Sequence, residues 1–233
     1  MADERGLAGL DPYDLQDEEC ARLSNWFGGM TDAEWSTPSA CDGWSRRDLL
    51  AHLVAVEEYF AACLQGSVAA LLTRYLEGRA SSLDDFNAAG VAASEGVDPQ
   101  ELLATWVQAN AANRAGFRAA DGTEIDTSAG SYPCRLQAFH VAFEYAVHAD
   151  DVDAPVAADD RERRRNWLAG VARFALTEVK TDVTVDDSTD GFIVARSGQP
   201  VTVDLDTFVA GVAGRSEPGT IDQQTAELLG LGY

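Results

Sequence analysis

Basic residues are scarce in this sequence. The chain has 39 acidic side chains among its 233 residues but only 17 arginine and lysine side chains, and Lys180 is the single lysine. The formal net charge of −22 at pH 7 repels phosphate groups. We therefore expect neither a nucleic acid nor an anionic membrane surface as a partner.

Other common sequence signals are missing. No apolar run approaches the roughly 18 residues that a membrane span requires. The acidic N-terminus lacks the apolar stretch of a signal peptide, which predicts a cytoplasmic protein. Walker-type and G-x-G-x-x-G loops are absent, which argues against nucleotide chemistry. The scattered cysteines include no C-x-x-C pair, so we expect reduced thiols at Cys20, Cys41, Cys63 and Cys134.

The hydrophobic pattern divides the chain into two parts. Amphipathic helical segments dominate up to about residue 155, and Ser45 with Asp48 has the pattern of a capping box that starts a long helix. After Lys180 the sequence changes to short β-rich runs separated by turn residues, followed by helix-like segments. The pattern predicts a mainly α protein, with a helical bundle in residues 1–155 and a small α+β domain in residues 156–233.

Two of the three histidines lie in the stretch "FHVAFEYAVHADD". His140, Glu144 and His148 follow at intervals of four, so they share one edge of the predicted helix, and Asp151 continues that edge. His52 lies on the apolar face of another long helix. Two helices of a bundle would thus offer imidazole and carboxylate groups to one interior, which is the usual composition of a bundle metal site.

Spacing alone leaves other interpretations open. In so acidic a chain, a glutamate four residues before a histidine is often a surface contact. A histidine in an apolar run, such as His52, is often a hydrogen-bonded core residue. Cys41, in the turn before the His52 helix, is a weaker candidate for a nucleophile because no basic partner is evident in the sequence.

Three motifs, taken in order along the chain, carry a family resemblance. The stretch "EWSTPSACDGWSRRDLLAHL" resembles the helix-entry motif of DinB-like metalloproteins, in particular the mycothiol-dependent maleylpyruvate isomerase family. A Glu-x3-His-x2-Asp motif and a Gly-Arg pair in "GVAGRSEP" complete the pattern. The matching residues are Gly43, Trp44, Asp48 and His52 for the first motif, Glu144, His148 and Asp151 for the second, and Gly214 and Arg215 for the third.

This resemblance implies a DinB-like four-helix bundle in residues 1–155, followed by the small α+β domain. It implies a divalent metal, usually zinc, bound by His52, Glu144 and His148, and assigns no ligand role to His140. It also implies mycothiol as thiol cofactor or co-substrate. The expected reaction is isomerisation or S-conjugation of an electrophilic, anionic small molecule, with Arg215 as the residue that orients its anionic group.

One position departs from the family pattern. Members similar to the isomerase often carry an arginine just before the metal-binding glutamate, whereas this chain has Phe143, so the resemblance does not specify the substrate. Two alternatives therefore stay open. One is a thiol-independent metal-dependent hydrolase on the same bundle, and the other is a non-catalytic, stress-related metal-binding protein.

Overall fold

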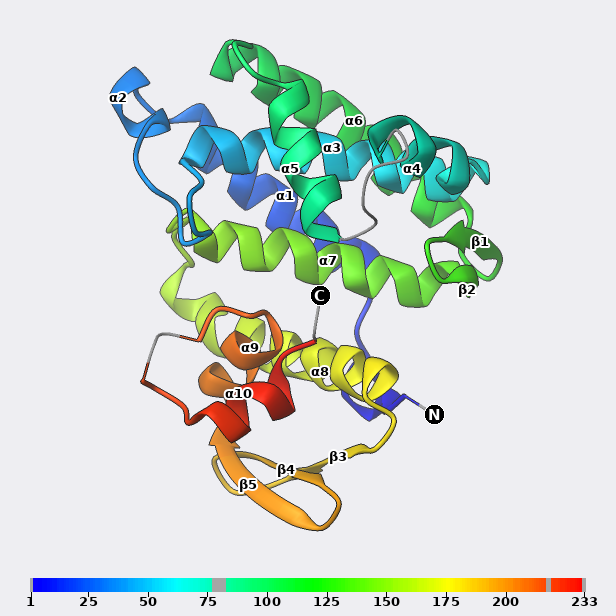
Figure 1. Cartoon of the computed structure of the whole chain (residues 1–233), viewed down its shortest axis with the longest axis vertical. Helices are drawn as coiled ribbons and strands as arrows, with labels where there is room; N and C mark the ends of the chain where they lie inside the picture. Colours follow the sequence, from blue (N-terminus) through cyan, green and yellow to red (C-terminus); the bar gives the residue numbers. More distant parts are fainter. Residues whose placement is uncertain (1, 77–82, 217–218, 232–233) are drawn as a thin grey trace. The chain divides into compact units, whose positions relative to one another are not determined.

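The computed structural model describes residues 2–76, 83–216 and 219–231 (Figure 1). The chain divides into two compact units, one of residues 11–155 and one that combines residues 1–10 with residues 156–232. The predicted fold class, a helical bundle followed by a small α+β part, is confirmed. Among the described residues, no helix has both the length and the apolar character needed to cross a membrane.

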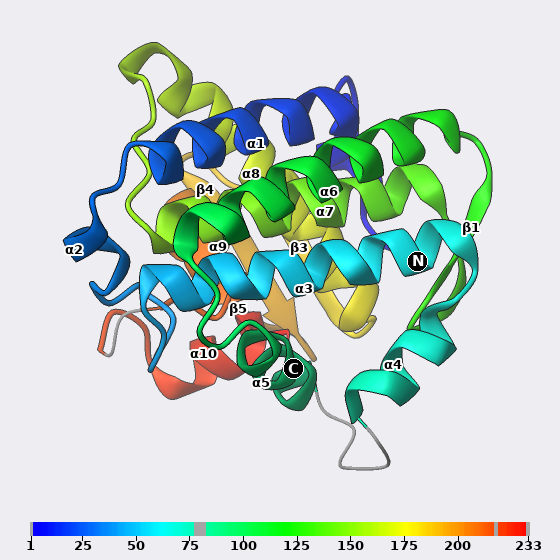
Figure 2. The same cartoon turned by 90° about the horizontal axis from the view of Figure 1, so that it is seen from above.

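Long helices build the first unit and run roughly alongside one another (Figure 2). They are α1 (Pro12–Gly28), α3 (Arg46–Gln65), α6 (Pro99–Ala119) and α7 (Cys134–Asp151). Helix α3 packs chiefly against α6, and α1 packs against both α7 and α6. The sequence predicts an apolar face on the helix that carries His52, and this face is confirmed in α3. It is made of the buried residues Leu49, Leu53, Val56, Phe60 and Cys63.

Shorter elements complete this unit. The helices are α2 (Asp32–Trp35), α4 (Val68–Leu76) and α5 (Leu83–Ala93). Strands β1 (Glu124–Thr127) and β2 (Gly130–Pro133) form an antiparallel hairpin between α6 and α7. The hydrophobic pattern did not predict this hairpin, because each strand is only four residues long.

The start and end of α3 follow from local chemistry. The Ser45 side chain accepts a hydrogen bond from the Asp48 backbone N–H, and the Asp48 side chain accepts one from the Ser45 backbone N–H. This reciprocal cap confirms the predicted capping box and satisfies two amide groups that the first helical turn leaves unpaired. Helix α3 ends at Gln65 and is capped by Gly66, whose φ of +67° is readily adopted by glycine.

The second unit combines one long helix with a small sheet. Strands β3 (Val183–Asp187), β4 (Gly191–Arg196) and β5 (Gln199–Asp204) form an antiparallel meander, and α9 (Leu205–Val212) packs on α8 (Arg161–Val179). On β3, Val183 and Val185 are buried and the residues between and after them are exposed, so one sheet face covers the core of this unit. The remaining elements are η1 (Glu4–Leu7), η2 (Ala158–Asp160) and α10 (Gln223–Leu229).

The N-terminal segment belongs to this second unit. The backbone N–H of Asp3 donates to Thr177 Oγ1 at 2.8 Å. Gly6 of η1 lies so close to Gly170 of α8 that a Cβ atom on Gly6 would lie 2.6 Å from the Gly170 Cα atom. Glycine is therefore required at this crossing because any side chain would separate the two backbones.

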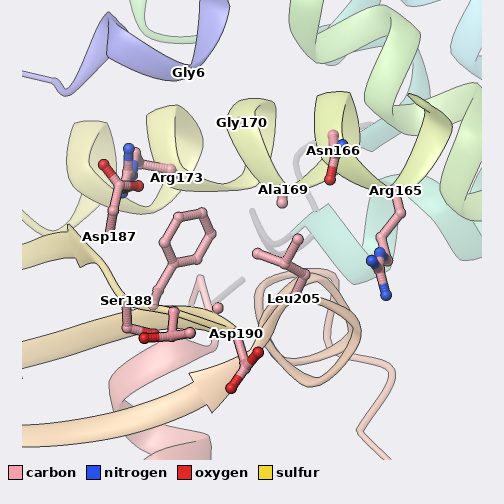
Figure 3. Close-up of a pocket in the computed structure, with 13 residues that line it drawn as sticks. Gly6, Arg165, Asn166, Ala169, Gly170, Arg173, Asp187, Ser188, Asp190 and Leu205 are labelled. Carbon is pink, nitrogen blue, oxygen red and sulfur yellow. Dashed lines mark hydrogen bonds and ion pairs between the residues drawn. The ribbon is translucent and has the colours of Figure 1, made fainter. Parts of the chain in front are cut away.

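A pocket of about 540 Å³ opens within the second unit, between α8 and the β3–β4 turn (Figure 3). Phe192 and Leu205 contribute apolar surface to its lining, which also includes the guanidinium groups of Arg165 and Arg173. Both guanidinium groups already face carboxylates: Arg173 Nη2 lies 2.6 Å from Asp187 Oδ1, and Arg165 Nη1 lies 3.7 Å from Asp206 Oδ2. The charge in this pocket is thus largely committed to internal pairs.

The close contact of η1 with α8 generates a stability prediction. We expect Gly170→Ala to lower the free energy of unfolding by about 1–3 kcal/mol, because the new methyl group would overlap the Gly6 carbonyl oxygen. Gly28→Ala is the matched control, since a Cβ atom there meets no atom within 4 Å. Scanning calorimetry would measure both, and an equal effect of the two substitutions would contradict the crossing as described.

Candidate metal centre

The helices α3 and α7 bring His52, Glu144 and His148 together. Glu144 and His148 lie four residues apart on α7, so their side chains point the same way from successive turns. His52 reaches them from α3. Sequence spacing could indicate that each helix offers ligands to the bundle interior, and the structure places the ligands of both helices at one point.

The three candidate ligand atoms form a nearly equilateral triangle. His52 Nε2 lies 3.2 Å from Glu144 Oε1 and 3.1 Å from His148 Nε2, and His148 Nε2 lies 3.1 Å from Glu144 Oε1. The imidazole groups are buried, with His52 3% and His148 6% exposed, whereas the Glu144 side chain is 36% exposed. The triangle is therefore embedded in the core on the histidine side and accessible on the glutamate side.

These spacings fit a metal ion. Zinc binds histidine nitrogen and carboxylate oxygen at about 2.0–2.2 Å, which separates the ligands of a tetrahedral ion by about 3.3 Å. The observed separations of 3.1–3.2 Å are close to that value, so a small movement of the side chains would admit the ion. A set of three protein ligands leaves a fourth position for water or substrate, as in catalytic rather than structural zinc sites.

The electrostatics of the cluster also favour a cation. Burial alone would raise the pKa of Glu144, but His148 and His52 outweigh it and hold this pKa well below its usual value. Burial alone would lower the pKa of His148, but the carboxylates of Glu144 and Asp151 raise it well above its usual value. The cluster thus stabilises positive charge among its three ligand atoms, and a metal ion would supply that charge.

Asp151 holds the His148 ring from behind. The Nδ1 atom of His148 lies 2.8 Å from Asp151 Oδ2, so a proton on Nδ1 is hydrogen-bonded to the carboxylate and the Nε2 lone pair is directed toward His52 and Glu144. Asp151 is 4% exposed.

The turn before α3 is fastened to the same end of α7. The Ala40 backbone N–H donates to the Asp151 carbonyl oxygen at 2.8 Å, and Cys41 Sγ lies 3.2 Å from Asp151 Oδ2. Gly43 has a φ of +78°, which explains glycine at this position in the motif. The turn places the centroid of the Trp44 ring 5.1 Å from the centroid of the His52 ring. Trp44 therefore forms part of the wall beside the cluster.

Other candidate residues lie outside the triangle. His140 is half-buried, and the centroid of its ring lies 6.2 Å from the centroid of the Tyr132 ring. Among the described residues, it joins no group of converging metal-ligating atoms. Cys41 Sγ lies 3.2 Å from Asp151 Oδ2, and it forms a second group of converging ligand atoms with His148 and Asp151. Sequence could not reveal this Cys41–Asp151 contact because 110 positions separate the two residues.

Arg215 lies in the second unit, just after α9. Gly214, with a φ of +69°, turns the chain there, and Arg215 Nη1 donates to the Ala213 carbonyl oxygen at 3.2 Å. The side chain is half-buried. Arg215 thus belongs to a different unit from the metal-ligand triangle.

A family model described as the mycothiol maleylpyruvate isomerase N-terminal domain matches residues 17–153, more than half of the chain. The chain belongs to this family. The matched range contains His52, Glu144, His148 and Asp151, so the whole triangle and its supporting carboxylate lie inside the family domain. Membership of this family makes the protein an enzyme, and the family's name describes an isomerase.

Solved structures support the same fold. A crystal structure of the mycothiol-dependent maleylpyruvate isomerase has a TM-score of 0.64 and 18% sequence identity, and the similarity covers 92% of each chain. A mutant of a mycothiol-dependent maleylpyruvate isomerase has a TM-score of 0.61 and 18% identity, with 88% of each chain covered. At this identity the similarity shows a shared fold. A search of curated proteins finds no significant match.

The triangle predicts a stoichiometric metal. We expect the purified, untagged protein to contain about one divalent ion per chain, and His52→Ala and Glu144→Gln to reduce this to less than about a tenth, because each removes one of three ligands. His140→Ala is the matched control and should retain the ion. Elemental analysis measures all four proteins, and equal metal contents in all of them would refute the site.

The carboxylate behind His148 generates a second prediction. Asp151→Asn should weaken zinc binding by about 10- to 100-fold while leaving the three ligands in place, because an amide holds the Nδ1–H less strongly than a carboxylate does. Competition with a coloured chelator measures the affinity. Asp153→Asn, two residues further on and exposed, is the control and should bind zinc as the wild type does.

Proposed function

We propose that the protein is a metal-dependent isomerase that uses mycothiol as its thiol. The observation that carries this proposal is the convergence of His52, Glu144 and His148 within the mycothiol maleylpyruvate isomerase family domain. In the proposed reaction, a thiolate adds to an electrophilic carbon of an α,β-unsaturated substrate. The π electrons of the C=C bond move onto the conjugated carbonyl group as the thiolate adds. After rotation about the resulting single bond, these electrons re-form the double bond and expel the thiolate, which gives the isomer.

The proposed metal ligands are His52, Glu144 and His148, and the proposed ion is zinc. Two imidazole nitrogens and one carboxylate oxygen form a donor set that suits zinc, and the 3.1–3.2 Å separations of the ligand atoms are compatible with it. When bound, a divalent ion supplies the Lewis acidity that keeps a coordinated thiol deprotonated at neutral pH.

The remaining residues of the site have supporting roles. Asp151 fixes the ring of His148 through its Nδ1 atom, so the Nε2 atom stays directed toward the cluster. The Trp44 ring lies beside the His52 ring and would form a wall of the site on the histidine side. Glu144 is the most exposed of the three ligands, and a substrate would therefore enter on its side.

We further propose that Arg215 orients an anionic group of the substrate or of the thiol. A guanidinium group can donate two parallel hydrogen bonds to one carboxylate, which fixes the position of the carboxylate as well as its charge. The support for this role is the Gly-Arg pair that follows α9. If that group belongs to the substrate, the electrophile carries at least one carboxylate.

S-conjugation would use the same groups. If the enolate formed by thiolate addition took up a proton before the thiolate left, the double bond would not re-form and the adduct would be the product. The products therefore distinguish the two reactions: an isomerase returns free mycothiol, and an S-transferase consumes it.

The function is tested by the thiol dependence of turnover. We expect zinc-loaded protein to isomerise maleylpyruvate with mycothiol at least about 100-fold faster than without it, because thiolate addition opens a path that the uncatalysed double bond lacks. His52→Ala should lose this rate, and His140→Ala should retain it. Arg215→Lys should raise KM more than it lowers kcat, because lysine keeps the charge but loses the two-pronged contact.

Two results would replace this proposal. Turnover of an ester or amide without any thiol would identify a hydrolase that uses activated water. A metal-loaded protein that lacks exchangeable water and any thiol-dependent activity would identify a non-catalytic metal-binding protein. Measurement of absorbance change and of free thiol in the same reaction separates isomerisation, S-conjugation and hydrolysis.

A further inference from the structure

A second polar cluster lies in the core of the bundle and is centred on Glu57. Glu57 is 1% exposed and lies on α3, five residues after His52. Its Oε1 atom accepts hydrogen bonds from Tyr145 Oη at 2.8 Å and from Asn110 Nδ2 at 2.9 Å. Its Oε2 atom accepts one from Asn113 Nδ2 at 2.8 Å. A single carboxylate therefore joins α3 to both α6 and α7.

The cluster continues to the fourth long helix. Asn110 Nδ2 also lies 3.0 Å from Cys20 Sγ on α1. The Asn110 Oδ1 atom accepts a hydrogen bond from Arg114 Nε at 2.7 Å, and Arg114 is paired with Asp17 of α1. Two successive hydrogen bonds through the Asn110 side chain therefore connect the Arg114 guanidinium group to the Glu57 carboxylate. Side chains from α1, α3, α6 and α7 all take part in this network.

A buried polar network of this kind costs free energy of folding compared with an apolar core. Burying a carboxylate costs several kcal/mol of hydration, and hydrogen bonds recover that cost only in part, so apolar residues of similar size often make a core more stable. Burial raises the pKa of Tyr145 well above its usual value, and Glu57 adds to this effect, so the phenol keeps its proton and donates a hydrogen bond to Glu57. The network does not maximise the stability of the core. A requirement to align particular helices with one another would explain why it is present.

The helices that need alignment are α3 and α7. Helix α3 packs chiefly against α6, and α7 packs chiefly against α1. Side chains bridge α3 and α7 at the metal-ligand triangle and at the Glu57–Tyr145 hydrogen bond. With a rise of 1.5 Å per residue, Glu57 lies about 7.5 Å along α3 from His52. On α7, Tyr145 directly follows Glu144, so the hydrogen bond lies close to the triangle on both helices.

We propose that Glu57 is a positioning residue for the metal centre: its hydrogen bond to Tyr145 sets the distance and register between α3 and α7, so that His52 meets Glu144 and His148. Asn110 and Tyr145 both donate to Glu57 Oε1, whereas Asn113 donates to the other oxygen, Oε2, and takes no part in the α3–α7 link. This inference rests on the metal site of the proposed function, but it does not depend on the thiol or the substrate.

The test compares two variants that each remove one hydrogen-bond partner of Glu57. Tyr145→Phe deletes only the hydroxyl group that links α7 to Glu57, and we expect it to weaken zinc binding about tenfold. Asn113→Ala removes a partner on α6 and leaves the α3–α7 link in place, so it should change zinc affinity by less than about twofold. Chelator competition measures affinity, and thermal unfolding of the metal-free proteins measures stability.

Glu57→Gln provides a stronger perturbation with a spectroscopic readout. The amide that it introduces would direct an N–H group at one of the present donors, so we expect the visible absorption of the cobalt-loaded protein to shift, because altered ligand positions change the coordination geometry. If Glu57→Gln does not fold, the Tyr145→Phe and Asn113→Ala pair still decides the question.

The outcomes separate this inference from the proposed function. Zinc affinity that is unchanged in Tyr145→Phe, or that falls in both variants in proportion to their loss of stability, would show Glu57 to be a structural residue. A wild-type protein that binds no zinc would overturn this inference together with the metal site. Zinc binding with the predicted difference, but without thiol-dependent turnover, would leave the positioning role intact and overturn only the reaction.

Discussion

Buried charge on the facing sides of α3 and α7 is the constraint on which the bundle depends. A charged group in the interior must be paired or bound to a metal, since it has lost its hydration. His52, Glu144 and His148 satisfy this requirement in one set, at separations of 3.1–3.2 Å. Glu57 satisfies it in a second set through Asn110, Asn113 and Tyr145. Each set requires α3 and α7 to keep one relative position.

The turn before α3 is also held in a fixed position relative to α7, by Asp151. Asp151 contributes its carboxylate to His148 and its carbonyl oxygen to Ala40, so one residue orients a ligand and fastens the turn. The left-handed conformation of Gly43 then directs Trp44 toward His52. The Gly-Trp and Glu-x3-His-x2-Asp motifs are far apart in the chain but form one connected structure, which gives a physical reason for their joint occurrence.

Much of the fold was predictable because its determinants are local. The capping box at Ser45, the apolar face of α3 and the α+β character of the C-terminal part were each read from residues within one element. The hairpin of β1 and β2 was not, since two four-residue strands carry too little periodicity. The association of η1 with α8 was also hidden, because it depends on Gly6 and Gly170 meeting across more than 160 positions.

For the candidate site, the sequence by itself determined which groups each helix could offer. Helical spacing put Glu144 and His148 on one edge and His52 on an apolar face, and the family resemblance paired them. Only the tertiary structure decided that their ligand atoms converge, that Cys41 lies beside Asp151, and that Glu57 meets donors from two other helices. The physical reason is that helical periodicity specifies the direction of a side chain about its own axis, whereas the packing of whole helices decides which side chains meet.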